Sequence, residues 1–593
     1  MSGSKNSTLS PAMRTASLSV NTSSAAVSSA RSVTGLRSIN PAARGEPFLW
    51  SMGGALVLGV FMIIAFLILI FWNGITTFYP KPIVAITLAD GKKVAGEPSR
   101  RETFRPDAAT LQGLDDSARA AIAANGGFAW RTLYKIGNFD LYNEDFKWVA
   151  DTDARSTANP VDIFFIERVE WGPFIGFIKA LNLDGQPVDY GADRADELDR
   201  AHSEAVERRN AIRRIERKEI ARINHRMEEH RLNLRAIELK HGAASSQYEG
   251  ATAEFAAEAA RLNDRFQALQ QEADRLKEQD SRFTLTLADV NGREKVLPLS
   301  AVVRLYPANS LNLFDKIGIY LSRWIEYLTA EPREANTEGG VMPAIFGTFI
   351  MTLLMVLAVA PFGVMAALYL REYAKQGRLV SIVRICVNNL AGVPSIVYGV
   401  FGLGFFAYII GGGIDRLFYP ERLPSPTFGT GGVLWAALTL ALLTVPVVIV
   451  ATEEALAAVP PSLREGSLAC GASKWQTIKH IVLPKAMPGI MTGLILAMAR
   501  GAGEVAPLML VGVVKLAPEL PVDSYFPFVH LERSFMHLGF HIFDVGFQSR
   551  NSEAGKPMVF VTTLLLISLV AMMNALAIVI RNRLKRKYVS GHF

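Results

Sequence analysis

Residues 465–484 read EGSLACGASKWQTIKHIVLP and lie between two long apolar stretches. Glu465-Gly466-Ser467 is followed by three residues, then Gly471, then nine residues, then Ile481-Val482-Leu483-Pro484. Gly471 permits a sharp turn because glycine has no Cβ. Pro484 and Pro488 are expected to prevent the segment that follows from continuing as one helix. The spacing therefore predicts a short helix, a turn and a second helix in the loop that joins two apolar segments.

The apolar stretches are long enough to cross a bilayer. Half of the 593 residues are hydrophobic and the mean hydropathy is +0.22. A membrane helix needs a run of about 20 apolar residues. Six such runs are predicted as spans: 50–73, 343–370, 386–411, 430–451, 489–514 and 558–580. The first run is too long for the apolar region of a signal peptide and has no small-residue cleavage pattern after it, so we expect it to stay in the mature chain.

The basic residues near the ends of the runs predict the orientation, because lysine and arginine are retained on the cytoplasmic side. They precede the first run, separate the second from the third and follow the last: Lys5, Arg14, Arg31, Arg37, Arg44, Arg371, Lys375, Arg378, Arg384, Arg581, Arg583, Lys585, Arg586 and Lys587. An even number of spans also places both termini on one side. We therefore expect a multi-pass membrane protein with both termini, and the loop around Glu465, in the cytoplasm.

The N-terminal segment and the cysteines carry little further information. Residues 1–47 are rich in Ser, Ala, Thr and Arg and are expected to form a disordered cytoplasmic tail; an organelle transit peptide is the alternative. The net charge of +7 is explained by membrane topology, and its distribution does not indicate nucleic-acid binding. Cys386 and Cys470 have no neighbours with metal or redox spacing, so no metal site is expected.

A soluble insert, residues 75–340, separates the first predicted helix (48–74) from the rest. Three stretches predict strands that run into hairpin turns at Asp90-Gly91, Asp184-Gly185 and Asn291-Gly292. Residues 194–280 lack proline, are rich in Glu, Arg, Ala and Leu, and break at His241-Gly242. Apolar residues there alternate by four and three, as in a coiled-coil seam: Phe255, Ala259, Leu262, Phe266, Leu269, Ala273 and Leu276. We expect an antiparallel coiled-coil hairpin within an α+β extracytoplasmic insert, its mixed charges forming a solvated face.

Four further stretches, read with the loop, resemble a known family. They are residues 347–373, 391–399 (AGVPSIVYG), 452–456 (TEEAL) and 500–507 (RGAGEVAP). Together with the loop, which resembles the E-A-A-x3-G-x9-I-x-L-P motif of ABC importer permeases, they are similar to the permeases of Pst-type phosphate ABC importers, nearest to the PstA subunit. The resemblance covers roughly residues 343–580. It does not extend to the insert or the N-terminal tail.

The resemblance implies a mainly α, multi-pass protein of the bacterial inner (plasma) membrane with a type I ABC importer permease core. That core would span residues 341–582 with five transmembrane helices and a docking loop at 453–488, followed by a cytoplasmic basic tail at 583–593. The docking loop would contact a separate ATPase through Glu465, Gly466, Gly471, Ile481, Leu483 and Pro484. The implied partners are a PstC-like second permease, PstB-like ATPases, a periplasmic PstS-like phosphate-binding protein and membrane lipid. No cofactor is implied for this chain, because ATP is used by the partner.

The residues themselves indicate one place for an anion. Arg500 and Glu504 are predicted within an apolar span, where an ionised side chain costs about 2.5–3.5 kcal/mol. Spaced i and i+4, they share a helix face, and an arginine fork matches phosphate oxygens. A purely structural ion pair is the alternative. Asn388, Asn389, Ser395 and Tyr398 are further candidates for the substrate path, or else hydrogen bond between helices.

The sequence does not favour an enzyme. It contains no G-x-x-x-x-G-K-[ST] phosphate loop and no H-E-x-x-H or G-x-S-x-G motif. Within the transporter class, a PstC-like subunit or a permease for sulfate or molybdate remains open. From another class, the alternative is a membrane-anchored coiled-coil sensor or scaffold, which would not need a docking loop.

Overall fold

The computed structural model describes residues 46–113, 116–333, 336–523, 526, 528–549 and 552–589. The chain divides into two units between Leu67 and Ile68. The predicted disordered tail lies outside the described residues except at its last two positions. Helix α1 (Glu46–Thr76) is one uninterrupted helix that carries the first apolar run.

The described residues contain six helical segments that are long and apolar enough to span a membrane, as predicted. They are Phe48–Thr76, Met342–Tyr373, Ser395–Phe418, Val433–Ala457, Lys474–Gly503 and Ser552–Arg586. Four of these six agree with the predicted runs within a few residues. The third and the fifth differ, and each difference has a local cause.

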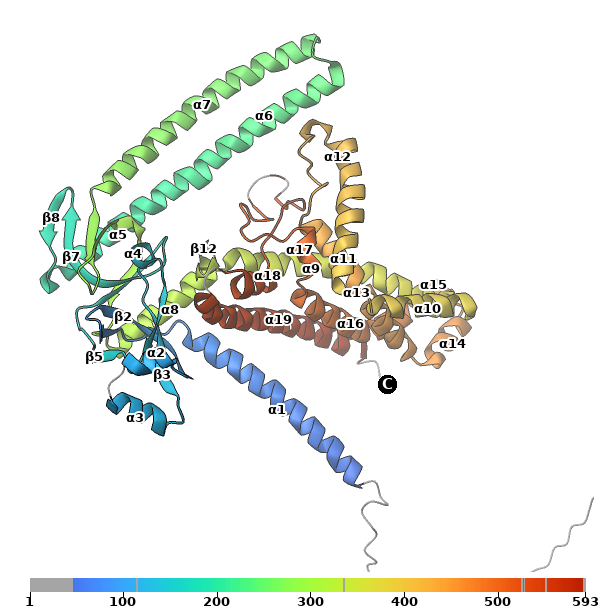
Figure 1. Ribbon diagram of the computed structural model, residues 1–593. Coiled ribbons are helices and arrows are strands. Elements are labelled where there is room, and N and C mark those ends of the chain that lie inside the picture. The colour runs from blue at the N-terminus through green and yellow to red at the C-terminus, as the bar shows by residue number, and fades with distance from the viewer. Residues whose placement is uncertain are drawn as a thin grey trace, which may run out of the picture. The chain divides into compact units, whose positions relative to one another are not determined.

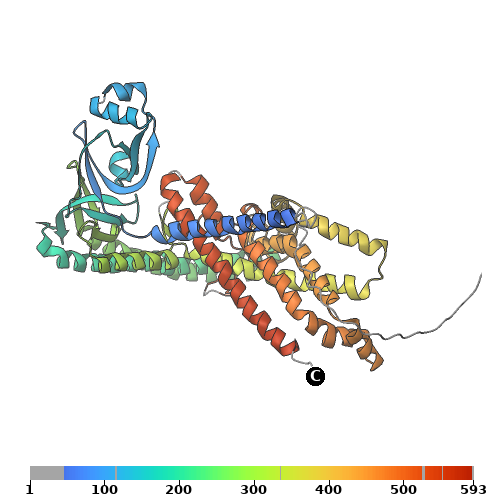
Figure 2. The same cartoon turned by 90° about the horizontal axis from the view of Figure 1, so that it is seen from below.

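Four helices form the centre of the membrane part: α9 (Met342–Leu368), α13 (Val433–Ala457), α16 (Leu483–Gly503) and α19 (Ser552–Val589). Figures 1 and 2 show them packed along one another. Small residues permit this close approach. A Cβ added to Gly501 would lie 2.2 Å from the sulfur of Met355, and one added to Gly363 would lie 2.6 Å from Val448.

The third span begins at Ser395, not at the predicted residue 386. Helix α10 (Arg378–Ala391) stops at Gly392, and Pro394 then serves as the N-cap of α11 (Ser395–Phe401). A proline disfavours helical conformation in the residue before it, so the chain breaks at Val393. The helix continues through a π-helical stretch, Gly402–Gly411, into α12 (Gly412–Phe418).

The fifth span shows that the prediction for Pro484 and Pro488 was wrong. A continuous helical segment runs from α15 (Lys474–Thr477) through a π-helical turn, Ile478–Val482, into α16. Pro484 lies in the first turn of α16, where a missing N–H is tolerated, and Pro488 lies inside the helix. The span ends at Gly503 and not at residue 514, because Glu504 has extended backbone angles.

Shorter helices complete the membrane part. The docking loop contributes α14 (Pro461–Ala469), and the segment between α16 and α19 contributes α17 (Leu508–Val511) and α18 (Leu538–Phe543). Helix α19 continues to Val589. The predicted tail boundary at residue 583 therefore falls inside a helix.

Two antiparallel sheets build the insert. The first has the order β4-β3-β2-β1-β5 and the second β10-β9-β7-β6-β11, with β8 paired to β7. The strands are β1 (Val84–Leu88), β2 (Lys93–Phe104), β3 (Ala129–Lys135), β4 (Phe146–Ala150), β5 (Ala154–Ala158), β6 (Phe164–Arg168), β7 (Phe174–Leu183), β8 (Gln186–Asp189), β9 (Thr284–Ala288), β10 (Glu294–Pro298) and β11 (Val302–Pro307). The three predicted hairpins are present as β1–β2, β7–β8 and β9–β10.

The insert also contains short helices and a small two-stranded sheet. These elements are α2 (Ala108–Gly113), α3 (Asp116–Ala124), α4 (Phe139–Tyr142), α8 (Leu313–Thr329), β12 (Pro332–Arg333) and β13 (Glu338–Gly339). Helix α8 begins with a capping box between Asn312 and Asp315. It leads through the β12–β13 hairpin into α9, the first helix of the membrane centre.

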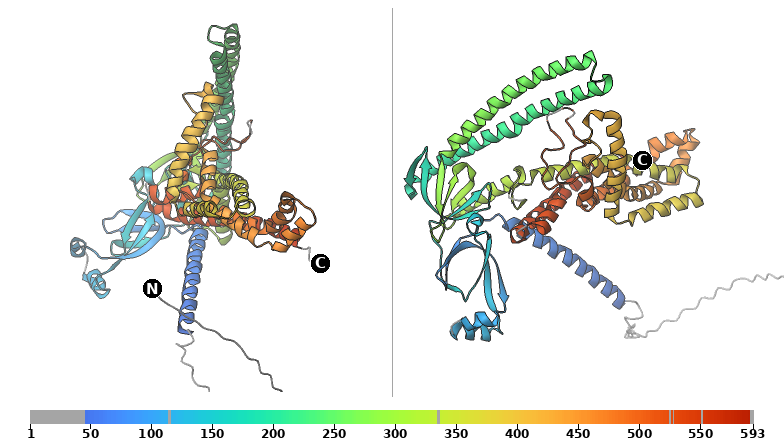
Figure 3. Two further views of the ribbon diagram at one scale, coloured as in Figure 1. Left: turned by 90° about the vertical axis from the view of Figure 1, so that its right-hand side faces the viewer. Right: turned by 45° about the horizontal axis from the view of Figure 1, so that its top comes forward.

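Residues 194–280 form two long helical arms. Helix α5 (Ala195–Arg214) continues through a π-helical turn, Ile215–Glu219, into α6 (Ile220–His241), and α7 (Ser246–Ser281) returns beside α6 (Figure 3). Coiled-coil packing stays a prediction, since only Leu262 and Ala273 of the seven seam residues are buried. The base of the first arm belongs to the insert core, where Leu198, Ala201 and Ala205 pack with the second sheet.

Candidate functional site

Arg500 and Glu504 lie where α16 ends. The Nε of Arg500 is 3.6 Å from Oε1 of Glu504, which is an ion pair but too long for a hydrogen bond. Glu504 caps the helix instead of lying inside it. The Arg500 side chain is 38% exposed, and Glu504 is its sole ionic partner within the described residues. Most donors of the guanidinium are therefore available to another ligand.

Helix α11 lies beside the segment that follows Glu504. A Cβ on Gly399 would come within 2.8 Å of the Pro507 Cα, so the two backbones touch. Tyr398 is buried and interacts electrostatically with Arg500. Its hydroxyl donates a hydrogen bond of 2.6 Å to the Leu390 carbonyl. Tyr398 thus lies near the arginine but is already held by the end of α10.

The other predicted polar residues are placed differently. Ser395 is half-buried in the first turn of α11. Asn388 and Asn389 are exposed on the last turn of α10. The structure therefore places Tyr398 beside the segment that follows Glu504 but leaves both asparagines on the surface of the described chain.

The docking loop contains the predicted helix, turn and helix. Gly471 has a φ of +83°, a conformation that glycine adopts readily and other residues rarely do. No atom lies within 4 Å of a Cβ built on Gly471, so the backbone angle and not space requires glycine. Ser473 then opens α15 with a capping box to Gln476. The Ser467 and Thr477 hydroxyls, 2.9 Å apart, join the two helices.

The loop presents its motif residues in two ways. Glu465 and Gly466 are exposed on α14, whereas Ile481, Leu483 and Pro484 are half-buried near the start of α16. Buried neighbours hold the base of the loop: Leu456, Val459, Val482, Ala486 and Ile490. The outer surface carries exposed apolar side chains: Leu463, Leu468 and Trp475. The loop is therefore rigid on its inner side and apolar on its outer side.

Two ion pairs near this loop were not singled out from the sequence. Arg464 pairs with Glu372 at 2.9 Å and donates hydrogen bonds to the carbonyls of Leu456 and Val459. It ties α14 both to the end of α13 and to the turn after α9. Nothing in the local sequence signals this pair, since its members are 92 residues apart.

Glu453 belongs to the second ion pair that the sequence did not predict. Its carboxylate lies 3.3 Å from the Arg384 guanidinium of α10. Glu453 thus joins α13 to α10 instead of extending into the docking loop. Thr452, one residue earlier, is buried and its hydroxyl has no hydrogen-bond partner in the described chain.

The described ranges contain no candidate metal centre. No group of three or more His, Cys, Asp or Glu side chains within them is arranged to hold a metal ion. Cys386 and Cys470 are both free and exposed. The chemistry near α16 is therefore that of a cation, a carboxylate and a phenol at the end of an apolar helix.

Comparison with known proteins agrees with this architecture. Residues 359–586 match the family described as binding-protein-dependent transport system inner membrane component. The probable ABC transporter permease protein YqgI of Bacillus subtilis is 30% identical over 256 residues, which cover 42% of this chain and 81% of YqgI. The chain belongs to the ABC transporter permeases. The resemblance to ABC importer permeases is thereby confirmed at the level of the permease family.

Further relatives match the same part of the permease. The probable ABC transporter permease protein YqgH of B. subtilis is 35% identical over 34% of this chain. The phosphate transport system permease protein PstA 1 of Mycobacterium tuberculosis (strain H37Rv) is 41% identical over 29% of this chain. These alignments span 62% of YqgH and 51% of PstA 1, less than two-thirds of either. The structure of the MetNI methionine ABC transporter matches 41% of the chain, with a TM-score of 0.31 and 19% identity.

Proposed function

We propose that this permease is the PstA-type membrane subunit of an ATP-driven importer of inorganic phosphate. The observation that carries the substrate assignment is the 41% identity to PstA 1 over 175 residues. The geometry at the end of α16 supports it, because a loosely paired guanidinium suits a tetrahedral anion. Six predicted spans in a family of non-catalytic permease subunits support the role of a translocation path.

Arg500 is the residue that we assign to anion recognition. At 3.6 Å, Glu504 neutralises the charge at rest without occupying the planar fork. An arriving phosphate competes with Glu504 for two parallel hydrogen bonds from the guanidinium. Tyr398 lies close enough to contribute polarity to the same path. Asn388 and Asn389 lie farther along the surface and are weaker candidates.

The docking loop is the proposed contact for the ATPase. Its exposed apolar side chains and its rigid turn fit a surface that receives force from a partner. The parity of the spans and the basic residues beside them favour a cytoplasmic loop and cytoplasmic termini. The insert would then lie outside, on the side where a phosphate-binding protein delivers the anion. A second permease would complete the pore.

Substitutions at Arg500 test the anion assignment in reconstituted vesicles with the co-purified subunits. Arg500→Lys keeps the charge but loses the fork, so phosphate uptake should fall far more than in the matched surface change Arg261→Lys. Arg500→Ala should abolish uptake. Equal uptake by Arg500→Lys and Arg261→Lys would contradict recognition by the fork.

A double variant separates recognition from a structural ion pair. If Arg500 recognises the anion, Arg500→Ala combined with Glu504→Ala should be stable but inactive. Restored uptake in the double variant would show that the pair is structural. Uptake of sulfate and molybdate, measured in the unmodified complex, distinguishes the alternative substrates. Absence of phosphate uptake or competition would overturn the substrate and leave the permease assignment intact.

A further inference from the structure

Helix α8 is amphipathic, and its apolar face is exposed. Five large side chains follow one another at intervals of three or four residues: Phe314, Ile317, Leu321, Ile325 and Leu328. Such spacing places them on one stripe of the helix. Their exposure ranges from 39% at Leu328 to 83% at Phe314. We call these five residues the α8 stripe.

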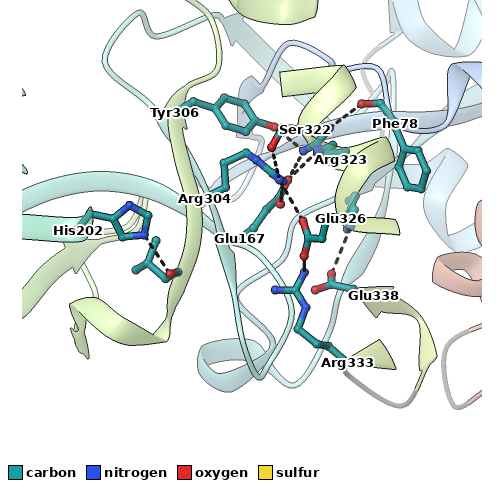
Figure 4. A network of polar contacts seen from close by, with 12 residues as sticks. Phe78, Glu167, His202, Arg304, Tyr306, Ser322, Arg323, Glu326, Arg333 and Glu338 are labelled. Carbon is teal, nitrogen blue, oxygen red and sulfur yellow. Dashed lines mark hydrogen bonds and ion pairs between the residues drawn. The ribbon is translucent and has the colours of Figure 1, made fainter. Parts of the chain in front are cut away.

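The opposite face of α8 packs on the insert and carries the charged residues Arg323 and Glu326 beside the apolar Ile319. Arg323 donates a hydrogen bond of 2.7 Å to Glu167, whose side chain is 13% exposed (Figure 4). Glu326 pairs with Arg304 at 3.0 Å and with Arg333 at 2.5 Å. The helix therefore directs Arg323 and Glu326 toward the insert and leaves the five apolar side chains of the stripe exposed. Contiguous exposed apolar surface of this kind marks an interaction site.

Aromatic contacts place α8 at the level where membrane spans begin and end. Trp324 packs edge-on against Phe78 with ring centroids 5.1 Å apart, and Tyr320 lies 6.4 Å from Tyr79. Phe78 and Tyr79 directly follow the first span, which ends at Thr76. These rings form one connected group, and tryptophan and tyrosine are enriched at membrane–water interfaces.

A hydrogen bond near the C-terminal end of α8 joins it to the last span. The Tyr327 hydroxyl lies 2.7 Å from the Thr562 hydroxyl of α19, and both residues are fully buried. Thr562 lies within the span Ser552–Arg586, after its first charged turns. The C-terminal part of α8 therefore meets an apolar part of a membrane helix, not its solvent-exposed end.

We propose that α8 is an interfacial helix and that the α8 stripe lies in the boundary between the lipid headgroups and acyl chains. The occupant is the bilayer, because an aromatic group joins α8 to the end of the first span, a hydrogen bond joins it to the last span, and its stripe has no polar side chain. Amphipathic helices bind this boundary through their apolar face. The polar face then holds the insert down on the membrane through the Arg323–Glu167 and Glu326–Arg304 pairs.

Spin labels along α8 test the proposal. In a full-length chain with Cys386→Ser and Cys470→Ser, single labels are attached at Phe314→Cys, Leu321→Cys and Ile325→Cys. The matched control is Val296→Cys, an exposed apolar position on strand β10 of the insert. The chain is reconstituted with its co-purifying subunits in liposomes of phosphatidylethanolamine and phosphatidylglycerol. Collision rates with oxygen, which concentrates in lipid, and with a water-soluble nickel chelate are then compared.

A lipid location predicts that the ratio of oxygen to nickel collisions is several-fold higher at the α8 positions than at residue 296. A ratio equal to that of the control would place the stripe in water and overturn the proposal. Low collision rates with both reagents would show that a protein subunit covers the stripe, which also overturns it. Use of three label positions guards against local disturbance by any one label.

Discussion

An arginine in the insert and an arginine at the end of α16 differ in how many of their hydrogen-bond donors are occupied. In the insert, Arg323 binds Glu167, the Phe78 carbonyl and the Tyr306 hydroxyl within 3.0 Å. At the end of α16, Arg500 has one ionic partner at 3.6 Å and is partly exposed. Both arginines face a carboxylate, but only the first has its donors occupied.

This difference indicates what each arginine does. A guanidinium whose three nitrogens each donate a hydrogen bond holds elements together and has few donors left for a ligand. A guanidinium with one long contact retains donors for an anion. Changes in the insert network should therefore alter stability and leave uptake in place. Changes in the membrane part should alter uptake or coupling and leave stability in place.

The largest effect is expected for Glu167→Ala. This change leaves Arg304 and Arg323 without their shared buried carboxylate, and breaking a buried pair in this way costs about 3–5 kcal/mol. Resistance of the insert to proteolysis during thermal unfolding of the full chain measures the loss. Glu238→Ala on α6 is the control, since its exposed pair with Arg235 is worth about 0–1 kcal/mol. Similar losses of stability in the two variants would show that the Glu167 network contributes no more to stability than the Arg235–Glu238 pair.

The same carboxylate predicts a pH dependence. Burial alone would raise the pKa of Glu167, but Arg323 and Arg304 hold it below its usual range. Its contribution to stability is then complete above the ordinary glutamate pKa of about 4.3 and disappears as the pH falls through the lower folded value. The stability difference between the unmodified chain and Glu167→Gln should stay constant from neutral pH to about 5 and shrink below about 4. A difference that shrinks near neutral pH would contradict this.

Gly471→Val tests the membrane side of the comparison. A β-branched residue at φ +83° is strained by at least about 1–2 kcal/mol, so the turn of the docking loop should distort. Uptake per ATP hydrolysed should fall about tenfold or more if that strain is transmitted to the contact. Gly471→Asn should be milder because asparagine tolerates positive φ. Equal and normal coupling in both variants would show that the turn does not transmit force.

Glu504→Gln sharpens the assignment of Arg500. Removing the carboxylate that competes with the anion should lower the KM for phosphate by up to about fivefold, the equivalent of ~1 kcal/mol for a partly exposed ion pair. Stability of the membrane part should change little. An unchanged KM together with a loss of stability would favour a structural pair.

The smallest effect is expected when the helical arms are shortened. Removing residues 226–239 and 248–261 takes two heptads from each arm and keeps the turn at Gly242. The base of α5 must stay, because Leu198, Ala201 and Ala205 belong to the insert core. Uptake in vesicles should remain close to that of the full chain. Loss of uptake with normal membrane insertion would give the arms an essential role.

Local pattern was sufficient to predict the elements whose causes are local. The three hairpins form at Asp-Gly and Asn-Gly pairs, and the turn of the docking loop forms at Gly471. The sequence was misleading where prolines occur within an apolar helical segment. Prolines 484 and 488 were expected to end a helix, but one lies in a first turn and the other inside a helix that packing maintains.

Some features of the candidate site could be predicted from the sequence, and others could not. That Arg500 and Glu504 are neighbours follows from their spacing alone. The length of their contact, the helix end at Gly503 and the approach of Tyr398 depend on helices far apart in the sequence. The pairs Arg464–Glu372 and Arg384–Glu453 were not predictable, since no local period relates residues 92 or 69 positions apart.

The sequence by itself determined the number of spans, the membrane class and the family. The length of an apolar run decides whether it can cross a bilayer, and the spacing of a short motif is a local property of the sequence. The tertiary structure alone decided which arginines have their hydrogen-bond donors occupied, and which face of α8 is exposed. Those properties depend on what surrounds a side chain. Arg323 and Arg500 are the same residue type. Only the partners that the fold places around them make Arg323 a structural residue and Arg500 a candidate binding residue.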